Sequence, residues 1–110
     1  MDKQDITINE VNNDGTLIHL HWDTHIGAWC AYGYSAYKLH LLNQSDDCRS
    51  IGRFSEDMMM PYLIVSDDML SHILRQSVDS AEQADSYIRI KVSGAIEKGT
   101  YNEWVRKINQ

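Results

Sequence analysis

A chain of 110 residues with 43% hydrophobic and 24% charged residues has the composition of one globular domain, residues 1–110, which excludes a disordered chain. The formal net charge is −6, and residues 43–86 alone, with nine acidic and three basic residues, carry a net charge of −6. Such an acidic field repels phosphate backbones and attracts basic proteins, so we expect no nucleic-acid binding.

The first residues lack the pattern of an export signal. Residues 1–10 alternate charged and β-branched residues, where a signal needs a basic end followed by an apolar run. No apolar run reaches the roughly 18 residues that cross a bilayer. We therefore expect a cytoplasmic protein without membrane contact. Cys30 and Cys48 fit neither a CxxC redox pair nor a zinc knuckle, and in a reducing compartment we expect two thiols.

The first two predicted strands flank a turn. Ile6 and Ile8, and then residues 18, 20 and 22, alternate with polar residues, which is the period of a half-buried strand. Residues 13–15 between them read Asn-Asp-Gly, so the pattern predicts a hairpin. Facing residues of an antiparallel pair share a face, and a three-residue loop sets Ile8 opposite Leu20. We predict that loop, with Gly15 at positive φ.

The next segments are less regular. Residues 24–33 fit a short helix or an irregular crossing equally well, and both alternatives stay open. From residue 34 to 42, Tyr37, Leu39 and Leu41 alternate with small or polar residues, which predicts a third strand. Residues 43–57 are polar and acidic, as in a long loop, and residues 62–65 form the short apolar run of a buried strand.

The rest of the chain predicts two helices and one strand. Ser66 precedes two acidic residues and then apolar residues at helical spacing, which predicts a helix around 67–78. Residues 80–86 resemble a connector with at most a turn of helix, and residues 88–92 alternate as a strand does. Thr100 and Glu103 have the spacing of a capping box, and Trp104 lies on the apolar stripe of a helix over 101–109.

Together these elements predict an α+β fold. Runs of strands with appended helices, rather than strict alternation, favour a mainly antiparallel sheet. We expect about four to five strands, with the helices around 67–78 and 101–109 packed on one face. Such folds support many activities, so function has to be inferred from particular residues.

The most distinctive local feature is the run from residue 19 to residue 25. Alternation puts His19, His21 and Asp23 on one face of a strand, and imidazoles and carboxylates are ligands of zinc. The run is similar to the HxHxDH metal segment of metallo-β-lactamase-like hydrolases, a resemblance that implies a metal-dependent hydrolase. Thr24 interrupts the motif before His25, and the fold of that family needs a much longer chain. We therefore assign the sequence to no family.

A metal site remains the alternative hypothesis. His40 lies opposite the apolar side of its predicted strand, so three imidazoles meet if that strand pairs with the one that carries His19 and His21. The metal set would then comprise His19, His21, Asp23, His25 and His40. We instead expect the histidines to face water while residues 18, 20 and 22 enter the core, and we expect no cofactor.

Other catalytic patterns lack support in the sequence. Cys30 lies between tryptophan and alanine and is predicted to be a buried small hydrophobic residue. Adjacent carboxylates, such as residues 46 and 47, do not share a face in regular structure, and neither glycine-rich phosphate motif is present. We therefore expect a protein that is not an enzyme.

The leading hypothesis is a non-enzymatic binding module. A small acidic domain suits electrostatic capture of a basic protein, most concretely as an immunity or antitoxin-type inhibitor of a basic, nuclease-like toxin. A homodimer is also compatible with the sequence. Aromatic anchors inside a charged rim are typical of protein interfaces. The predicted contact residues are Asp46, Asp47, Phe54, Glu56 and Asp57.

Overall fold

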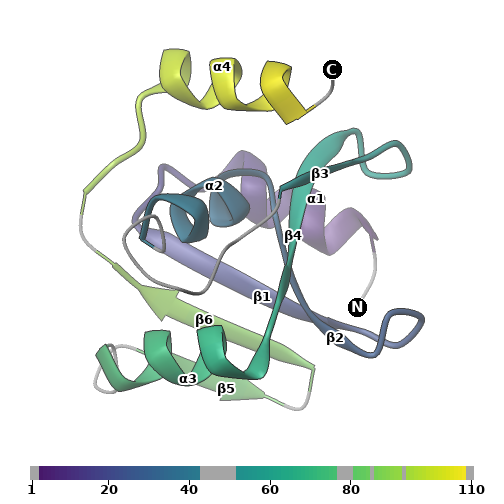
Figure 1. The fold of residues 1–110 in the computed structure, drawn as a ribbon, viewed down its shortest axis with the longest axis vertical. Helices are drawn as coiled ribbons and strands as arrows, with labels where there is room; N and C mark the ends of the chain where they lie inside the picture. The colour runs from purple at the N-terminus through teal and green to yellow at the C-terminus, as the bar shows by residue number, and fades with distance from the viewer. Residues whose placement is uncertain (1–2, 43–51, 77–80, 85, 93, 109–110) are drawn as a thin grey trace.

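The structure is a computed structural model that describes residues 3–42, 52–76, 81–84, 86–92 and 94–108 (Figure 1). Its centre is an antiparallel sheet of six strands in the order β3-β4-β2-β1-β6-β5. The strands are β1 (Leu17–Asp23), β2 (Ala28–Tyr32), β3 (Arg53–Ser55), β4 (Met60–Val65), β5 (Ala81–Ala84) and β6 (Tyr87–Lys91).

Three helices cover the first face of the sheet. They are α2 (Gly33–Leu42), α3 (Asp67–Gln76) and α4 (Lys98–Ile108). The register aligns Ile18 with Ile90 and Leu20 with both Ile88 and Ala31, so these apolar side chains share that face. They form one core cluster with buried residues of the three helices, including Leu39, Met69, Ile73 and Trp104.

The fourth helix, α1 (Lys3–Val11), lies on the second face. Its Ile6 joins a smaller buried cluster with Cys30 and Tyr32, which point to the side opposite Ala31. At the other end of α1, the Glu10 carboxylate accepts hydrogen bonds from the backbone N–H and the hydroxyl of Ser35 at 3.0 and 2.7 Å. The helix is therefore attached at two points.

The structure confirms the predicted fold class and three elements of the second half of the chain. The strand at 62–65 is part of β4, the helix at 67–78 corresponds to α3, and the strand at 88–92 corresponds to β6. The Ser66 hydroxyl accepts a hydrogen bond from the backbone N–H of Met69 at 3.2 Å, as an N-cap does. Within the described residues, no helix combines the length and apolar character needed to span a membrane.

The predicted N-terminal hairpin is wrong. Residues 3–11 form α1, in which the buried pair is Ile6 and Glu10, one helical turn apart, while Ile8 is 49% exposed. The Asn-Asp-Gly turn therefore joins a helix to β1. Gly15 does have positive φ, 97°, and its N–H donates to the Asn13 side-chain oxygen at 2.9 Å.

The predicted third strand is also wrong, since residues 33–42 form α2. All five side chains from residue 35 to residue 39 are buried, so α2 does not show the polar stripe by which an amphipathic helix is recognised. Leu41, predicted to point inward with Leu39, is 40% exposed. The open segment 24–33 contains a turn and β2.

Two smaller predictions need correction. The sheet has six strands because two short edge strands, β3 and β5, form within the segments predicted as a loop and a connector. Helix α4 begins at Lys98, before the predicted capping box, and the Thr100 hydroxyl donates to the Glu97 carbonyl at 2.9 Å. The two predicted helices, α3 and α4, do pack on one face, and the additional helix α1 lies on the other.

Candidate functional site

Aromatic rings form a continuous ladder on the second face of the sheet. The members come from four neighbouring strands, with His19 and His21 on β1, Tyr87 on β6, Tyr32 on β2 and Tyr62 on β4. Successive ring centroids are 5.9, 5.3, 6.1 and 6.0 Å apart in the order His19, Tyr87, His21, Tyr32, Tyr62. These distances are typical of aromatic contacts.

The two histidines of this ladder are buried, which corrects the expectation that they face water. His19 is 5% exposed and His21 is 2% exposed. Burial lowers the pKa of each imidazole to about 4, with a further contribution from Arg89 at His19 and from His19 at His21. Both rings are therefore neutral at pH 7, so each has one donor and one acceptor nitrogen.

The two rings differ in their hydrogen bonds. The Nδ1 atom of His19 lies 2.5 Å from the Tyr87 hydroxyl. Both ring nitrogens of His21 are buried, and neither has a hydrogen-bond partner among the described residues. A buried polar atom without a partner is destabilising by about 1 to 3 kcal/mol, so His21 stands out as a group available to a ligand.

The predicted alternation along β1 is confirmed for its faces but not for Trp22. His19 and His21 share the second face, while Ile18 and Leu20 are fully buried on the first. Trp22 is 38% exposed at the end of the strand, where it meets Trp29 edge to face at 5.5 Å. The prediction that Trp22 enters the core is therefore wrong, because β1 ends at the rim of the sheet.

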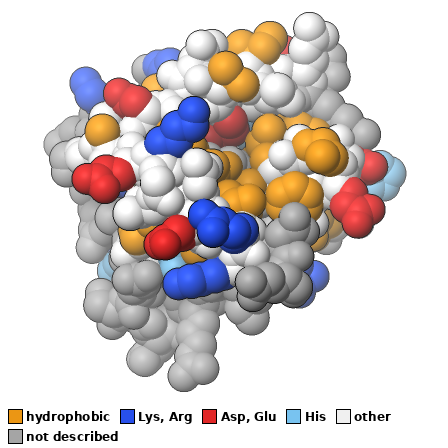
Figure 2. All heavy atoms as spheres, turned by 90° about the horizontal axis from the view of Figure 1, so that it is seen from above, with side chains coloured by type: hydrophobic (Ala, Val, Ile, Leu, Met, Phe, Trp, Pro, Cys, Tyr) orange, Lys and Arg blue, Asp and Glu red, His pale blue; other side chains and the backbone are white. Residues whose placement is uncertain are grey.

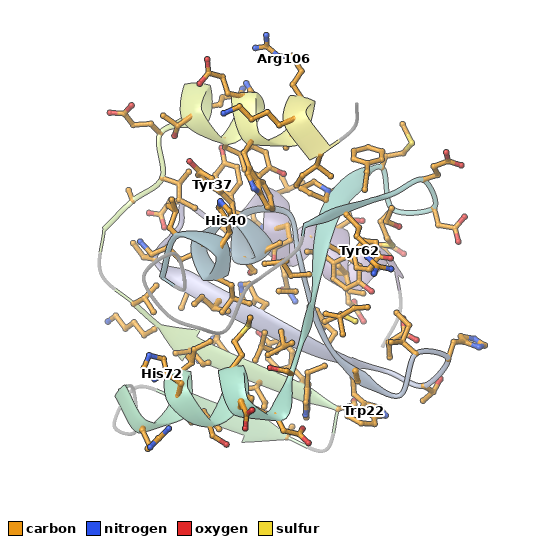
Figure 3. The ribbon with its side chains drawn as sticks, viewed as in Figure 1. Trp22, Tyr37, His40, Tyr62, His72 and Arg106 are labelled. Carbon is orange, nitrogen blue, oxygen red and sulfur yellow. The ribbon has the colours of Figure 1, made fainter. Side chains whose placement is uncertain are left out.

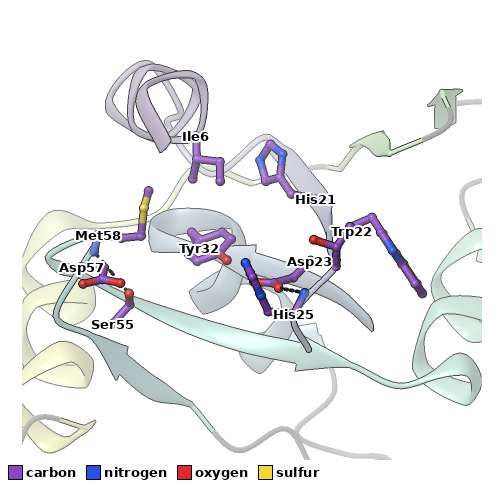
Figure 4. Close-up of a pocket in the computed structure, with 10 residues that line it drawn as sticks. Ile6, His21, Trp22, Asp23, His25, Tyr32, Ser55, Asp57 and Met58 are labelled. Atoms are coloured by element: carbon purple, nitrogen blue, oxygen red, sulfur yellow. Dashed lines mark hydrogen bonds between the residues drawn. The ribbon is translucent and has the colours of Figure 1, made fainter. Parts of the chain in front are cut away.

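A hollow of about 470 Å³ opens beside His21 between α1 and the second face (Figure 4). Ile6 of α1 lies over one end of it, and the ring of Trp22 points away. The volume is typical of ligand sites. Two carboxylates and no Lys or Arg side chain line it within the described residues, and its other polar groups include imidazoles and hydroxyls. The lining includes His21, Asp23, Tyr32, Ser55 and Asp57.

Two tight turns hold the polar groups of this hollow in place. In the β1–β2 turn, one oxygen of Asp23, Oδ1, accepts hydrogen bonds from the backbone N–H groups of His25 and Ile26 at 2.8 and 3.0 Å. In the β3–β4 turn, the Ser55 hydroxyl accepts one from the N–H of Met58 at 3.2 Å. Short turns that are held by side-chain to backbone hydrogen bonds keep the polar groups of a site in a fixed arrangement.

A smaller hollow of about 190 Å³ adjoins the first and shares Asp23, Tyr32 and Ser55 with it. Its other walls are Phe54, Tyr62 and Ile26, the last of which is 44% exposed. The two hollows form one groove of acidic and aromatic character, which we call the acidic groove. Sequence reasoning missed Tyr32 and Ser55, because only the register of β2, β3 and β4 brings them beside Asp23.

The structure separates the residues of the alternative metal site. His40 belongs to α2 on the first face, where its ring lies 6.3 Å from Tyr37 and 5.3 Å from Trp104, and Figure 3 shows it beneath α4. The sheet therefore lies between His40 and the histidines of β1. Within the described residues, no three His, Cys, Asp or Glu side chains are grouped as metal ligands.

We predict that the purified protein carries no stoichiometric zinc, because the ring nitrogens of His19 and His21 are buried apart from any third ligand in the described chain. Elemental analysis of the protein checks this. About one zinc per chain that is lost in the double variant His19→Ala, His21→Ala would contradict the prediction.

Three of the predicted partner-binding residues, Phe54, Glu56 and Asp57, lie in or near the β3–β4 turn. Phe54 is half-buried in the acidic groove, while Glu56 and Asp57 are exposed, with Asp57 on the wall of the larger hollow. Asp46 and Asp47 lie outside the described residues, as does Cys48.

Cys30 is fully buried as a free thiol, as predicted, and burial together with nearby Asp23 raises its pKa to about 11.

The buried carboxylate of Glu10 was not expected from the sequence. It is 7% exposed and also accepts a hydrogen bond from the Asn13 side chain at 3.3 Å. Burial outweighs these hydrogen bonds and raises its pKa to about 7.

Comparison of the chain with protein-family models, with curated proteins and with solved structures found no match.

Proposed function

We propose that this protein is a non-enzymatic binding module whose acidic surface captures a basic protein, most concretely as an immunity or antitoxin-type inhibitor of a nuclease-like toxin in the cytoplasm. The observation that supports it best is the acidic groove. Carboxylates of Asp23 and Asp57 stand beside the aromatic rings of Tyr32 and Tyr62, and no Lys or Arg lines the groove within the described residues. Aromatic and acidic groups together suit a basic surface.

The exposed apolar side chains around the groove favour a protein partner. Met59 is 75% exposed at the tip of the β3–β4 turn, and Ile26 and Ile64 are 44% and 37% exposed on the same side of the sheet. Apolar side chains inside a charged rim are the usual arrangement of protein interfaces. The Met59 backbone has φ of 54°, so this side chain is presented from a tight turn.

The charge of the molecule is also unevenly distributed. The last turn of α4 carries Arg106 and Lys107, and Figure 2, which looks onto the α4 side, shows Lys and Arg side chains interspersed with Asp and Glu. The acidic groove lies around the β1–β2 and β3–β4 turns, and the strand β3 that leads into the second turn contacts α4. A basic partner is therefore expected to approach the groove, where Asp23 and Asp57 stand without Lys or Arg among the described lining residues.

The test is the association rate with a basic partner, isolated by affinity capture from the source organism. Changing Asp46, Asp47, Glu56 and Asp57 to their amides is expected to slow association about tenfold at low salt. Raising the ionic strength should slow the unmodified protein in the same way, because screening acts over about 8 to 10 Å. The melting temperature should change little, since Glu56 and Asp57 are exposed.

The matched control makes the same four-charge change elsewhere. Amide substitutions at four acidic positions of α3 and the α4 region should change the association rate much less. An acidic partner, or association that responds to neither salt nor the substitutions at Asp46, Asp47, Glu56 and Asp57, would exclude electrostatic capture. The control positions are Asp67, Asp68, Glu97 and Glu103.

A further inference from the structure

We infer that the larger hollow of the acidic groove is a receptor for a guanidinium group, supplied by an arginine side chain of the basic partner. The inference rests on the proposed function and names the chemistry of its contact. It starts from His21, the one described side chain whose buried polar atoms have no hydrogen-bond partner, and from the groups that share its hollow.

The groups around the hollow are rich in hydrogen-bond acceptors. Asp23 and Asp57 are acceptors only, and the hydroxyls of Tyr32 and Ser55 accept as well as donate. The two hydrogen bonds that the Asp23 carboxylate accepts from backbone N–H groups both go to Oδ1, and no described residue donates to its Oδ2. A ligand that matches this wall must therefore bring several donors and a positive charge.

A guanidinium fits these requirements better than an ammonium. It presents five N–H donors in one plane and has no acceptor, whereas a lysine head presents three donors at one point. Its planar face also stacks on aromatic rings, and Tyr32 stands in the wall between His21 and the Asp57 side. Two carboxylates that flank an aromatic ring thus suit an arginine.

His21 supplies a further contact, on the part of the hollow's wall next to Ile6 of α1. Its neutral ring has one acceptor nitrogen, and an entering N–H gives that atom a hydrogen bond that the fold does not provide. Both ring nitrogens are buried beneath α1, a helix held by Ile6 and Glu10. Binding is therefore expected to displace the Ile6 end of α1 slightly.

The first experiment uses small probes and needs no partner. The N-acetyl, N-methylamide derivative of arginine should produce saturable NMR shifts at His21, Asp23 and Tyr32, while the citrulline derivative, of similar shape but neutral, should not. Asp23→Asn keeps the turn acceptor and should weaken binding about tenfold, and His21→Phe about fivefold. Glu103→Gln on α4 is the control and should have no effect. Equal shifts with arginine and citrulline, or shifts centred elsewhere, would overturn the guanidinium site.

The second experiment tests the source of the guanidinium with the captured partner. Asp23→Asn and His21→Phe should each increase the dissociation rate while the salt dependence of association remains. If the arginine probe binds but neither substitution changes the dissociation rate, the group is not the partner's arginine and the inference is wrong. If no basic partner exists, the proposed function fails, and the probe titration still decides whether the hollow recognises guanidinium.

Discussion

Trp104→Ala is expected to lower the free energy of unfolding by about 3 to 5 kcal/mol, as for other large core aromatics. The Trp104 side chain is 9% exposed and joins α4 to α2, with its ring 5.1 Å from Tyr37 and 5.3 Å from His40. A Cβ added at Gly52 would lie 2.8 Å from its ring, so the cavity left by alanine is closely walled. Chemical denaturation measures the loss.

The matched control is Arg106→Ala, on the exposed side of the same helix, which should change stability by less than about 0.5 kcal/mol. A loss below about 1 kcal/mol for Trp104→Ala would mean that α4 does not depend on this side chain for its attachment.

Glu10→Gln is expected to stabilise the protein relative to the parent by about 3 kcal/mol at pH 8, and by much less near pH 4. The pKa of Glu10 is about 7 in the folded state, against 4.5 for an unperturbed glutamate. Between pH 4.5 and 7 the folded protein therefore keeps a proton on Glu10 that the unfolded chain has lost. The parent therefore loses stability as pH rises from about 4.5 to 7, and glutamine, which has no charge to bury, does not.

Unfolding free energies of both proteins across this pH range provide the measurement. Taking the difference between the two at each pH cancels the contribution of His19 and His21, whose lowered pKa values act in the opposite direction. Glu97→Gln, at an exposed position before α4, should show no such pH dependence. A flat difference for Glu10→Gln would show that the carboxylate ionises in the folded state without penalty.

The second half of the fold was predictable because its signals are local. Ser66 caps α3 with its own side chain, and the residues of β6 alternate between the core and the other face. Helix α4 has one apolar stripe, in which Trp104 is the buried residue. In each case the burial of the element follows directly from its own spacing.

The first half was mispredicted because tertiary contacts decide it. Ile6, Thr7 and Ile8 favour a strand by residue type, yet residues 3–11 are helical, with Glu10 bonded to Ser35 in α2. The alternation of β1 put His19 and His21 on one face correctly. It did not show that α1, together with side chains from the strands beside β1, would bury these histidines. The candidate site could therefore be predicted only in part.

The position of β1 also affects how the chain folds as it is synthesised. One edge of β1 pairs with β2, the next strand in sequence, but the other pairs with β6, which lies in the last quarter of the chain. At about 5 to 20 residues per second, the ribosome leaves that edge unpaired for several seconds. A nascent chain that stops before Tyr87 would present the His19 and His21 strand as an open edge, able to pair with a neighbouring chain. Translational pausing in this window should therefore favour aggregation, and long-range pairing of the central strand should make refolding slow.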